Sequence, residues 1–435
     1  MSDVNETRTP GEIVDEYIAG MNARIGETHP AVVVKKTVPG QVDDFFNTEL
    51  WREYVTEDVI REHAMVTGDF NPLWRDKEYA ENSVWHGMIG SPLFLYSMGG
   101  SPALPVAPNV KGWLGFAGGG IVEVFQPFRG GDKVIAEDVW LGYSDISKPG
   151  AKNRLFLLKA QRRMSTAERG LICTCTYTAP CQAPLNAEGQ KAYEEALAKA
   201  AAEGAAADAP KKPKKHRNQR GIHAYTEEEL DVIYRHYEDE AAGRLRRGND
   251  PRFFEDVKVG DNLGTVLKGP INAGDLGAFS TIFPGRACAD QYMWGIAGAP
   301  KESLLRDPDT NQLTSSASFH IDNQIARLVG CERAINFGVA EEMYCAHVLS
   351  NWMSDYGWVR KFTGRTYAQN LIGDTTVLTG TVTKVYEENG RGLVDVEVVG
   401  TEMSSNVKLV GANATIQLPH KGNEEEVVKA VLAGK

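Results

Sequence analysis

The stretch from residue 67 to residue 88 gathers side chains suited to acid–base chemistry. Asp69 and Asn71 lie in a compact Gly-Asp-Phe-Asn-Pro turn, and His86 and Gly87 directly precede a long apolar run that indicates the start of a buried helix. The N-terminus of a helix presents unpaired N–H groups, so these groups together could polarise a carbonyl and move a proton. Asn-Pro is also a common turn dipeptide, and Asp69 could instead cap its own turn.

The composition restricts the class of protein. The chain has 435 residues, of which 42% are hydrophobic and 24% are charged, so it has enough material for two or three globular domains. A formal net charge of -11 argues against nucleic acid as a partner. The N-terminus is polar, and no apolar run reaches the roughly 18 residues that a membrane span needs. We therefore expect a cytoplasmic protein with no membrane partner.

Nothing in the sequence indicates a cofactor or a metal. The six cysteines show no Cys-x-x-Cys pair or zinc spacing and are interpreted as small hydrophobic residues in a reducing compartment. No His-Glu-x-x-His motif occurs. The glycine-rich run near Gly115 lacks the strand–loop–helix context of a dinucleotide site, so we expect no cofactor.

The elements that would position the Asp69 turn alternate between helix and strand patterns. Residues 10–26 have apolar side chains at helical spacing, and Thr56 is a plausible N-cap for a second helix that leads into the turn. After Lys111 the period changes to two, which predicts strands over residues 120–128, 133–146, 154–164 and 171–180. A helix followed by an antiparallel meander predicts an α+β fold in which one sheet wraps one helix.

The composition changes between about residues 184 and 249. An Ala/Glu/Lys-rich helical stretch is followed by the basic run 211–220 and then by a second helical stretch. The basic run could bind a phosphorylated cofactor tail, or it could be a solvated linker. We predict an N-terminal domain over 1–183, a helical linker over 184–249 and a C-terminal domain over 250–435. The three histidines of this region, which are interpreted as non-catalytic, are His216, His223 and His236.

The second half of the chain repeats landmarks of the first. His320 corresponds to Trp74 (320 − 74 = 246), Gly338 to Gly87 (338 − 87 = 251), and the Gly-Asp at 373–374 to that at 131–132 (374 − 132 = 242). Asp275 likewise parallels the helix start at Thr56. Landmarks in one order at nearly constant offset indicate one fold used twice, as an internal pseudo-dimer.

The motifs Gly-Asp-Phe-Asn-Pro-Leu-Trp-Arg-Asp, His-Gly-Met and Pro-Phe-x-x-Gly-Asp then resemble those of the MaoC-like hydratase group. This group contains the R-specific enoyl-CoA hydratases and the dehydratase region of type I fatty acid synthases. The resemblance covers about residues 46–182 and 250–420. With two such modules in one chain, the sequence resembles the two-module bacterial acyl dehydratases. It implies a double hotdog, with two antiparallel sheets each wrapped around a central helix.

The resemblance also implies a chemistry, from which this sequence departs. In the group, an Asp and a His five residues later share a water that adds to a 2-enoyl thioester, an Asn helps to orient it, and a backbone N–H near a helix start binds the thioester oxygen. Asp69 and Asn71 match this pattern, but Trp74 stands at the histidine position. In the second half His320 matches the histidine, but Ser315 stands at the aspartate position.

Three interpretations follow from this split motif. In the first, the site uses Asp69, Asn71 and the Gly87 amide, with His86 or a residue of the other half replacing the missing base. In the second, the site is built on His320 with Asp322 or an acid such as Glu341 or Glu342. In the third, the chain binds thioesters or supports a partner without catalysis.

Each candidate residue also has a structural interpretation. Trp74 is more easily explained as pocket wall or core, and as a pocket wall it would reshape the site for an aromatic, cyclic or branched acyl group. His86 could have the purely structural role of a hydrogen bond to a loop carbonyl, and His320 could be a buried core histidine. His63 and His347 lie in predicted helices beside apolar residues and are interpreted as structural.

We therefore predict a hydratase or dehydratase that interconverts a 2-enoyl thioester, expected to be an acyl-CoA, and its 3-hydroxyacyl counterpart. The predicted catalytic residues are Asp69, Asn71, His86, His320 and Asp322, and the predicted substrate-binding residues are Trp74, Gly87 and Gly338. A homo-oligomer is expected. The alternatives are a hotdog thioesterase, for which Glu341 or Glu342 would supply the carboxylate, and a non-catalytic thioester-binding or scaffold protein.

Overall fold

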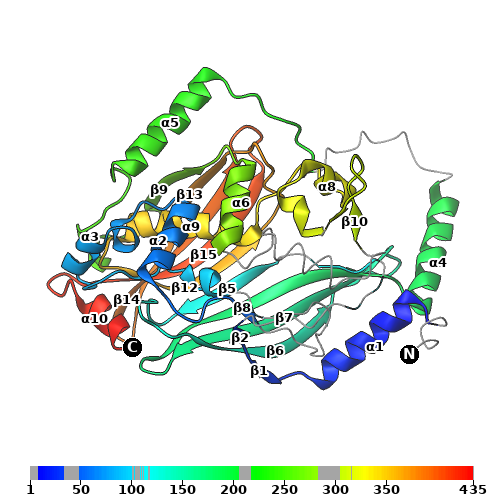
Figure 1. The fold of residues 1–435 in the computed structure, drawn as a ribbon, viewed down its shortest axis with the longest axis horizontal. Coiled ribbons are helices and arrows are strands. Elements are labelled where there is room, and N and C mark those ends of the chain that lie inside the picture. The colour runs from blue at the N-terminus through cyan, green and yellow to red at the C-terminus, as the bar shows by residue number, and fades with distance from the viewer. Residues whose placement is uncertain are drawn as a thin grey trace.

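The computed structural model describes residues 8–33, 49–99, 102, 108, 110, 112–115, 118–204, 217–282, 304–314 and 316–434. Its main feature is one sheet of eleven strands in the order β1-β6-β7-β8-β5-β12-β15-β14-β13-β9, with β4 paired to β8 (Figure 1). Every neighbouring pair in this sheet is antiparallel. The chain is thus an α+β protein built on a large antiparallel sheet, as its periodicity predicts.

Each half of the chain supplies half of this sheet. The first half contributes β1 (Thr28–Pro30), β4 (Leu114–Gly115), β5 (Gly119–Val124), β6 (Ile135–Asp145), β7 (Arg154–Thr166) and β8 (Gly170–Ala183). The second half contributes β9 (Asn262–Lys268), β12 (Trp358–Thr366), β13 (Thr376–Glu388), β14 (Arg391–Glu402) and β15 (Lys408–Leu418). Two small sheets pair β2 (Val32–Val33) with β3 (Glu49–Leu50), and β10 (Leu305–Arg306) with β11 (Leu313–Thr314). The four predicted strands of the first half correspond to β5, β6, β7 and β8.

The strand order confirms the internal repeat. The two halves mirror each other about the β5–β12 pair, where Val122 lies opposite Phe362, an offset of 240 (362 − 122). The edge strand β1 corresponds to β9, and the meander β6-β7-β8 corresponds to β13-β14-β15. A pseudo-dimer joined at one strand pair places each half's loops beside the other half, which is how distant residues can build one site.

The two separate sheets expected from the resemblance are not what the structure shows. Because β5 and β12 pair along their edges, their backbone groups are satisfied across the halves and the two sheets are continuous. Glycine permits the close approach here: a Cβ on Gly119 would lie 2.3 Å from the carbonyl oxygen of Gly364.

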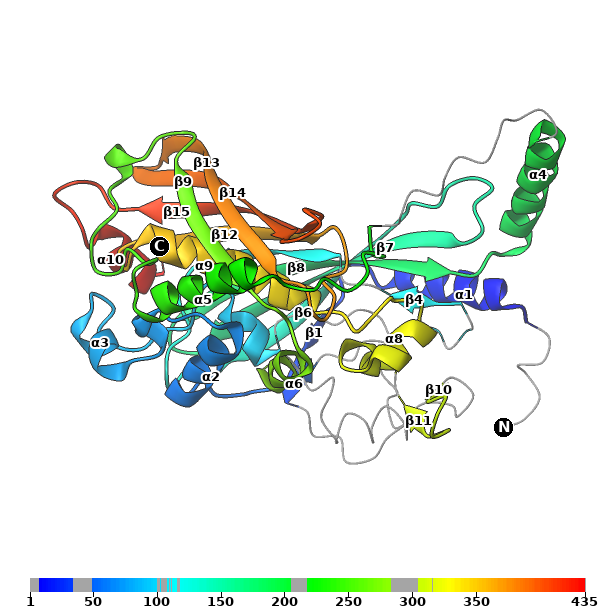
Figure 2. The ribbon, with the colours of Figure 1, turned by 90° about the horizontal axis from the view of Figure 1, so that it is seen from above.

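A long central helix is described in the second half, where α9 (Gly338–Met353) is buried and packs against β9 and the strands β12 to β15 (Figure 2). Among the described residues, the corresponding part of the first half contains the five-residue 3-10 helix η2 (Phe94–Met98). Pro92 lacks an N–H and disfavours regular helix around it, which explains why the helix predicted to begin at Gly87 does not form there.

The remaining helices surround this sheet. They are α1 (Pro10–Ala23), α2 (Glu57–Thr67), η1 (Pro72–Trp74), α3 (Lys77–Asn82), α4 (Ala187–Gly204), α5 (Glu227–Ala241), η3 (Phe254–Asp256), α6 (Ala273–Ile282), η5 (Ser316–His320), α8 (Asn323–Leu328) and α10 (Glu426–Leu432). Thr56 caps α2 as predicted, because its side chain accepts a hydrogen bond from the Val59 N–H at 3.1 Å. Over the described ranges, no helix combines the length and the apolar character that crossing a membrane would require.

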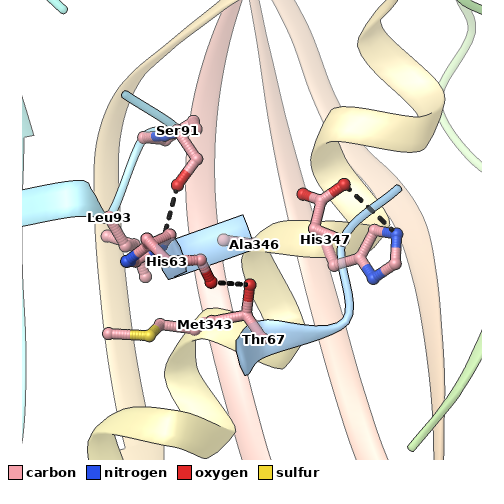
Figure 3. A pocket seen from close by; sticks show the side chains of 9 residues that line it. His63, Thr67, Ser91, Leu93, Met343, Ala346 and His347 are labelled. Atoms are coloured by element: carbon pink, nitrogen blue, oxygen red, sulfur yellow. Dashed lines mark hydrogen bonds and ion pairs between the residues drawn. The ribbon is translucent and has the colours of Figure 1, made fainter. Parts of the chain in front are cut away.

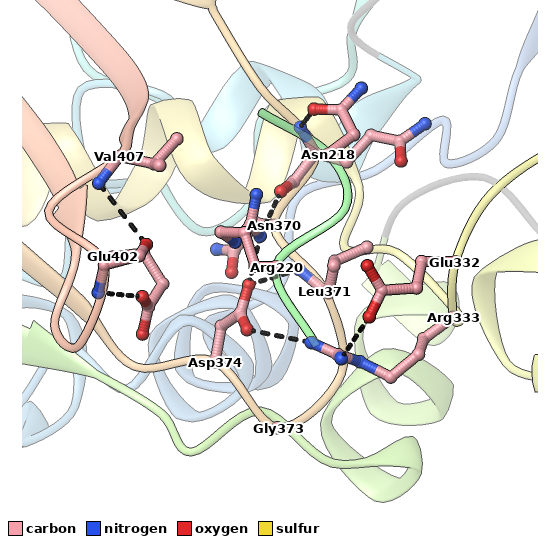
Figure 4. A network of polar contacts seen from close by, with 12 residues as sticks. Asn218, Arg220, Glu332, Arg333, Asn370, Leu371, Gly373, Asp374, Glu402 and Val407 are labelled. Atoms are coloured by element: carbon pink, nitrogen blue, oxygen red, sulfur yellow. Dashed lines mark hydrogen bonds and ion pairs between the residues drawn. The ribbon is translucent and has the colours of Figure 1, made fainter. Parts of the chain in front are cut away.

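The described part of the linker from residue 217 onward is bound to the second half. The Arg220 guanidinium donates to the Gln369 carbonyl at 2.6 Å and pairs with Asp374 at the start of the β13 turn (Figure 4). Arg333 donates to the other oxygen of Asp374 at 3.2 Å. The last residue of the basic run is therefore used to dock the linker on the second half. The domain limits 1–183, 184–249 and 250–435 stay predictions.

Candidate active site

Residues of opposite halves meet at the C-terminal part of α9. The Asp69 Oδ1 atom lies 3.6 Å from the His347 Nε2 atom, and the Ser350 hydroxyl donates to Asp69 Oδ2 at 3.2 Å. Asp69 comes from the loop after α2, whereas His347 and Ser350 lie three residues apart on α9 and so on one helical face. Asp69, which has a tryptophan rather than a histidine five residues later, thus faces a histidine of the other half.

The Asp69 loop is held by its own backbone. α2 ends at Gly68, whose φ of 63° lies in the left-handed region that glycine adopts most easily. Asp69 Oδ1 accepts from the Asn71 N–H at 3.0 Å, and Asn71 Oδ1 accepts from the Leu73 N–H at 3.0 Å. Asp69 therefore does close its turn, the structural interpretation of the sequence, and at the same time presents its carboxylate to His347.

The linker helix α5 supplies a second carboxylate to the same histidine. His347 Nε2 lies 2.8 Å from Glu240 Oε1, and Asn351 Nδ2 donates to Glu240 Oε2 at 3.0 Å. Burial alone would raise the pKa of Glu240, but the hydrogen bond and charge of His347, the charge of Lys268 and the Asn351 amide together lower that pKa to about 2. One imidazole nitrogen is thus shared between two carboxylates. The other, Nδ1, is buried and has no hydrogen-bond partner among the described residues.

A buried lysine balances these carboxylates. Lys268, on the edge strand β9, donates to the carbonyl oxygens of Thr67 and Gly68, both at 2.8 Å. These carbonyls end α2, where the helix dipole favours a cation. Burial lowers the pKa of Lys268 to about 8, and the charges of Asp69 and Glu240 limit the fall. Lys268 therefore ties the Asp69 loop of the first half to the sheet of the second.

A chain of hydroxyls and an imidazole forms another side of the site. His63 Nε2 lies 3.0 Å from the Ser91 hydroxyl, and His63 Nδ1 lies 2.8 Å from the Ser97 hydroxyl. Burial lowers the pKa of His63 to about 4, so the ring is neutral at physiological pH, despite the opposing charge of Asp69. A neutral ring donates from one nitrogen and accepts at the other.

These groups face a narrow pocket between the halves. The volume open to a water-sized sphere is about 10 Å³, which is about enough for one water molecule. The lining residues are His63, Thr67, Asp69, Ser91, Pro92, Leu93, Met343, Ala346 and His347. Figure 3 shows Ser91 and His63 on one side of this pocket and His347 on the other. Polar and apolar side chains share this wall, and a carboxylate beside an imidazole can move a proton between a bound water and carbon.

Three predicted residues of the first half lie elsewhere. Trp74 is 1% exposed and does not line the pocket, so it is a core residue rather than a pocket wall. His86 is exposed and has a φ of 53°. The Gly87 N–H donates to the Ala80 carbonyl at 2.9 Å, so it is not the unpaired helix-start donor that the motif predicts.

The predicted residues of the second half form a different cluster. His320 binds the Ile335 carbonyl oxygen through Nδ1 at 2.8 Å and stacks on Phe337 with ring centroids 4.0 Å apart. Asp322 caps α8 by accepting from the Gln324 N–H at 2.7 Å. Gly338 begins α9, nine residues before His347 (347 − 338), which is about 14 Å along a helix. The structure therefore does not bring these residues to Asp69.

The two acids proposed for a thioesterase are buried inside α9. Glu342 accepts from the Tyr96 hydroxyl at 2.8 Å, and burial raises the pKa of Glu342 to about 7. Burial, and next the Glu342 charge, raise the pKa of Glu341 well above its usual value. Both side chains are 1% exposed, and neither lines the pocket. Ser315, His216 and Cys288 lie outside the described residues.

The side chains that lie closest to Asp69 and His347 were not predicted from the sequence. His347 was interpreted as structural because it lies beside apolar residues in a buried helix, and Glu240 was assigned to a linker. The signal for His347 was a histidine, a serine and an asparagine at 347, 350 and 351, which share one face of the same predicted helix. Within the part of the chain that the structure describes, no three His, Cys, Asp or Glu side chains gather as metal ligands would.

Comparison with solved structures identifies the fold. One match, described as a MaoC-like dehydratase, is 17% identical and covers 92% of this chain and 100% of the other, with a TM-score of 0.52. A second, a MaoC domain protein dehydratase from Chloroflexus aurantiacus, is 12% identical and covers 97% and 100%, with a TM-score of 0.50. The chain therefore has the fold of the MaoC-like dehydratases, as its motifs predict. No protein-family model and no curated protein matches the sequence.

Proposed function

We propose that the chain is a hydratase/dehydratase that interconverts a 2-enoyl thioester, with CoA as the expected carrier, and its 3-hydroxyacyl counterpart. The observation that carries the proposal is the Asp69–His347 pair, which joins a carboxylate and an imidazole of opposite halves at the wall of one pocket. The fold supports the same reaction class, since the structures it resembles are described as dehydratases. This is the first of the three interpretations, with a residue of the other half in place of the family's histidine.

In the hydration direction, the oxygen of a water bonds to C3 of the enoyl group while C2 gains a proton. Asp69 takes a proton from the water, because its carboxylate is fixed by the Asn71 N–H and the Ser350 hydroxyl. His347 delivers a proton to C2 from Nδ1, the ring atom that no described protein group occupies. Dehydration reverses these transfers. Glu240 acts only through His347, so it is a positioning residue.

The test uses wild-type protein, Asp69→Asn and His347→Asn, with a panel of enoyl-CoA thioesters of different chain length. Loss of absorbance from the conjugated thioester follows hydration directly. We expect both variants to lose about 10²–10⁴-fold in kcat, the range for removal of a general acid or base. Asp58→Asn is the matched control, because Asp58 lies in the first turn of α2 with a side chain 92% exposed and should leave the rate unchanged.

The other outcomes separate the alternatives. Release of free CoA without loss of conjugation favours a thioesterase. Binding without turnover favours a thioester-binding or scaffold protein. If His320→Asn abolishes hydration and Asp69→Asn does not, the site lies at the His320 cluster and the proposal for Asp69 is wrong. A cytoplasmic location and a homo-oligomer remain parts of the proposal that cell fractionation and sedimentation can check.

A further inference from the structure

The backbone donor that the sequence motif predicts for the thioester oxygen is already occupied in this structure. Charge that develops on the thioester oxygen requires a donor aimed at it. The backbone donor that the motif predicts, the Gly87 N–H, is bound to the Ala80 carbonyl oxygen at 2.9 Å. Another donor must therefore face the thioester oxygen if the proposed reaction takes place in this pocket.

Ser91 is placed to be that donor. Its side chain is half-buried and lines the pocket that Asp69 and His347 also line. It lies across the pocket from His347 (Figure 3). A thioester with its C2 and C3 at the Asp69–His347 side would thus meet the Ser91 hydroxyl on another wall. This hydroxyl is hydrogen-bonded to His63 Nε2 at 3.0 Å, on the side away from His347.

The direction of the hydrogen bonds follows from what each buried hydroxyl needs. Ser97 is 0% exposed, and among the described residues its hydroxyl is hydrogen-bonded to His63 Nδ1. A buried hydroxyl should donate its proton, so Ser97 donates to Nδ1 and the neutral ring carries its proton on Nε2. Nε2 then donates to the Ser91 oxygen, which leaves the Ser91 proton free to point into the pocket. Successive bonds in one direction polarise each other and strengthen the last donor.

We infer that the Ser91 hydroxyl binds the thioester carbonyl oxygen and stabilises its charge during the reaction, with His63 and Ser97 as positioning residues. This inference rests on the proposed function. It assigns the oxygen-binding role to a side chain that the sequence motif does not contain. The lowered pKa of His63 agrees with it, because a ring protonated on both nitrogens could not accept from Ser97.

The kinetic test is Ser91→Ala in the full chain. Loss of one donor to a developing oxyanion is expected to lower kcat by about 10²–10³-fold with little change in KM. Ser97→Ala should lower kcat less, because it removes only a bond that orders the ring. Ser280→Ala is the matched control: Ser280 is buried in α6, donates to the Leu276 carbonyl and lies outside the pocket. An unchanged kcat in Ser91→Ala overturns the inference.

A spectroscopic test does not depend on turnover. Cinnamoyl-CoA carries a conjugated thioester whose absorption shifts to longer wavelength when its carbonyl oxygen is hydrogen-bonded. We expect a red shift on binding to wild type, Asp69→Asn and Ser280→Ala, and its loss in Ser91→Ala. If wild type binds the probe without a shift, or if Ser91→Ala keeps the shift, Ser91 is not the donor. A shift that depends on Ser91, in a protein that hydrates no enoyl-CoA, would support the binding role and reject the proposed reaction.

Discussion

The substitution Glu240→Gln isolates the contribution of the linker helix to the site. Glutamine keeps the size of the side chain and one oxygen that can accept from His347 Nε2, but it removes the charge and the second oxygen, which accepts from Asn351 Nδ2. The pKa of Glu240 falls from 4.5 to about 2, which is about 2.5 units. At 1.36 kcal/mol per unit, the partners of the carboxylate outweigh its burial by about 3 kcal/mol. The side chain is 6% exposed, so solvent screens this little.

This free energy sets an upper limit on two losses in Glu240→Gln, one of stability and one of kcat. The unfolding free energy at pH 7 should fall by up to about 3 kcal/mol. Because Glu240 acts on the reaction only through His347, kcat should also fall, by at most about 10²-fold, since each 1.4 kcal/mol is a factor of ten. The pKa is depressed in the folded state, so the stability is present above about pH 4.5 and is lost as the pH falls through about 2. The stability difference between wild type and variant should therefore shrink over that window.

Urea unfolding at pH 7, 4 and 3, together with kcat for hydration, measures both effects. Glu238→Gln is the matched control, because Glu238 lies on the same helix and is exposed. If Glu240→Gln matches wild type in both rate and stability at pH 7, the carboxylate does not act on His347 and the assigned role of α5 is wrong.

Two further predictions concern buried groups whose charge depends on pH. Lys268→Met should remove a transition in kcat near pH 8, because the pKa of Lys268 is about 8 and its loss of charge unbalances Asp69; a transition that persists in the variant would contradict this assignment. Burial raises the pKa of Glu342 to about 7, so the folded state holds its proton more tightly and stability falls as the pH rises from about 4.5 through 7. Glu342→Gln should flatten that dependence and stabilise the protein at pH 8 by up to about 3 kcal/mol in urea unfolding, whereas equal slopes with pH would refute the reasoning.

The sequence predicted much of the fold because its signals were local. Strand periodicity located β5 to β8, Thr56 located the start of α2, and the repeated landmarks predicted two related halves. It did not predict the continuous sheet, because the β5–β12 pairing depends on how the edges of the two halves meet. It predicted a helix after Gly87 from apolar composition alone, whereas backbone geometry around Pro92 allowed only the short η2.

The site was only partly predictable for a related reason. Asp69 and Asn71 were found from their spacing, but their partners lie 278 residues away in sequence at His347 (347 − 69) and on a linker helix at Glu240. A histidine among apolar neighbours has the same local pattern whether it packs in a core or lines a pocket. Only the contact across the halves distinguishes these two cases.

The difference between the halves explains why the first-half loop carries the candidate chemistry. The partners of Asp69 come from a long helix of the other half. That helix is α9, which places His347 and Ser350 on the face toward Asp69. The equivalent loop of the second half ends at His320. The element of the first half that corresponds to α9 is the five-residue η2, which is too short to supply the same partners to this loop. His320 instead packs on Phe337, at the start of its own half's helix. At the position of the family's aspartate the second half has Ser315. The described residues of the first half also include no helix like α9 to complete a second site. We therefore expect one active site in each chain.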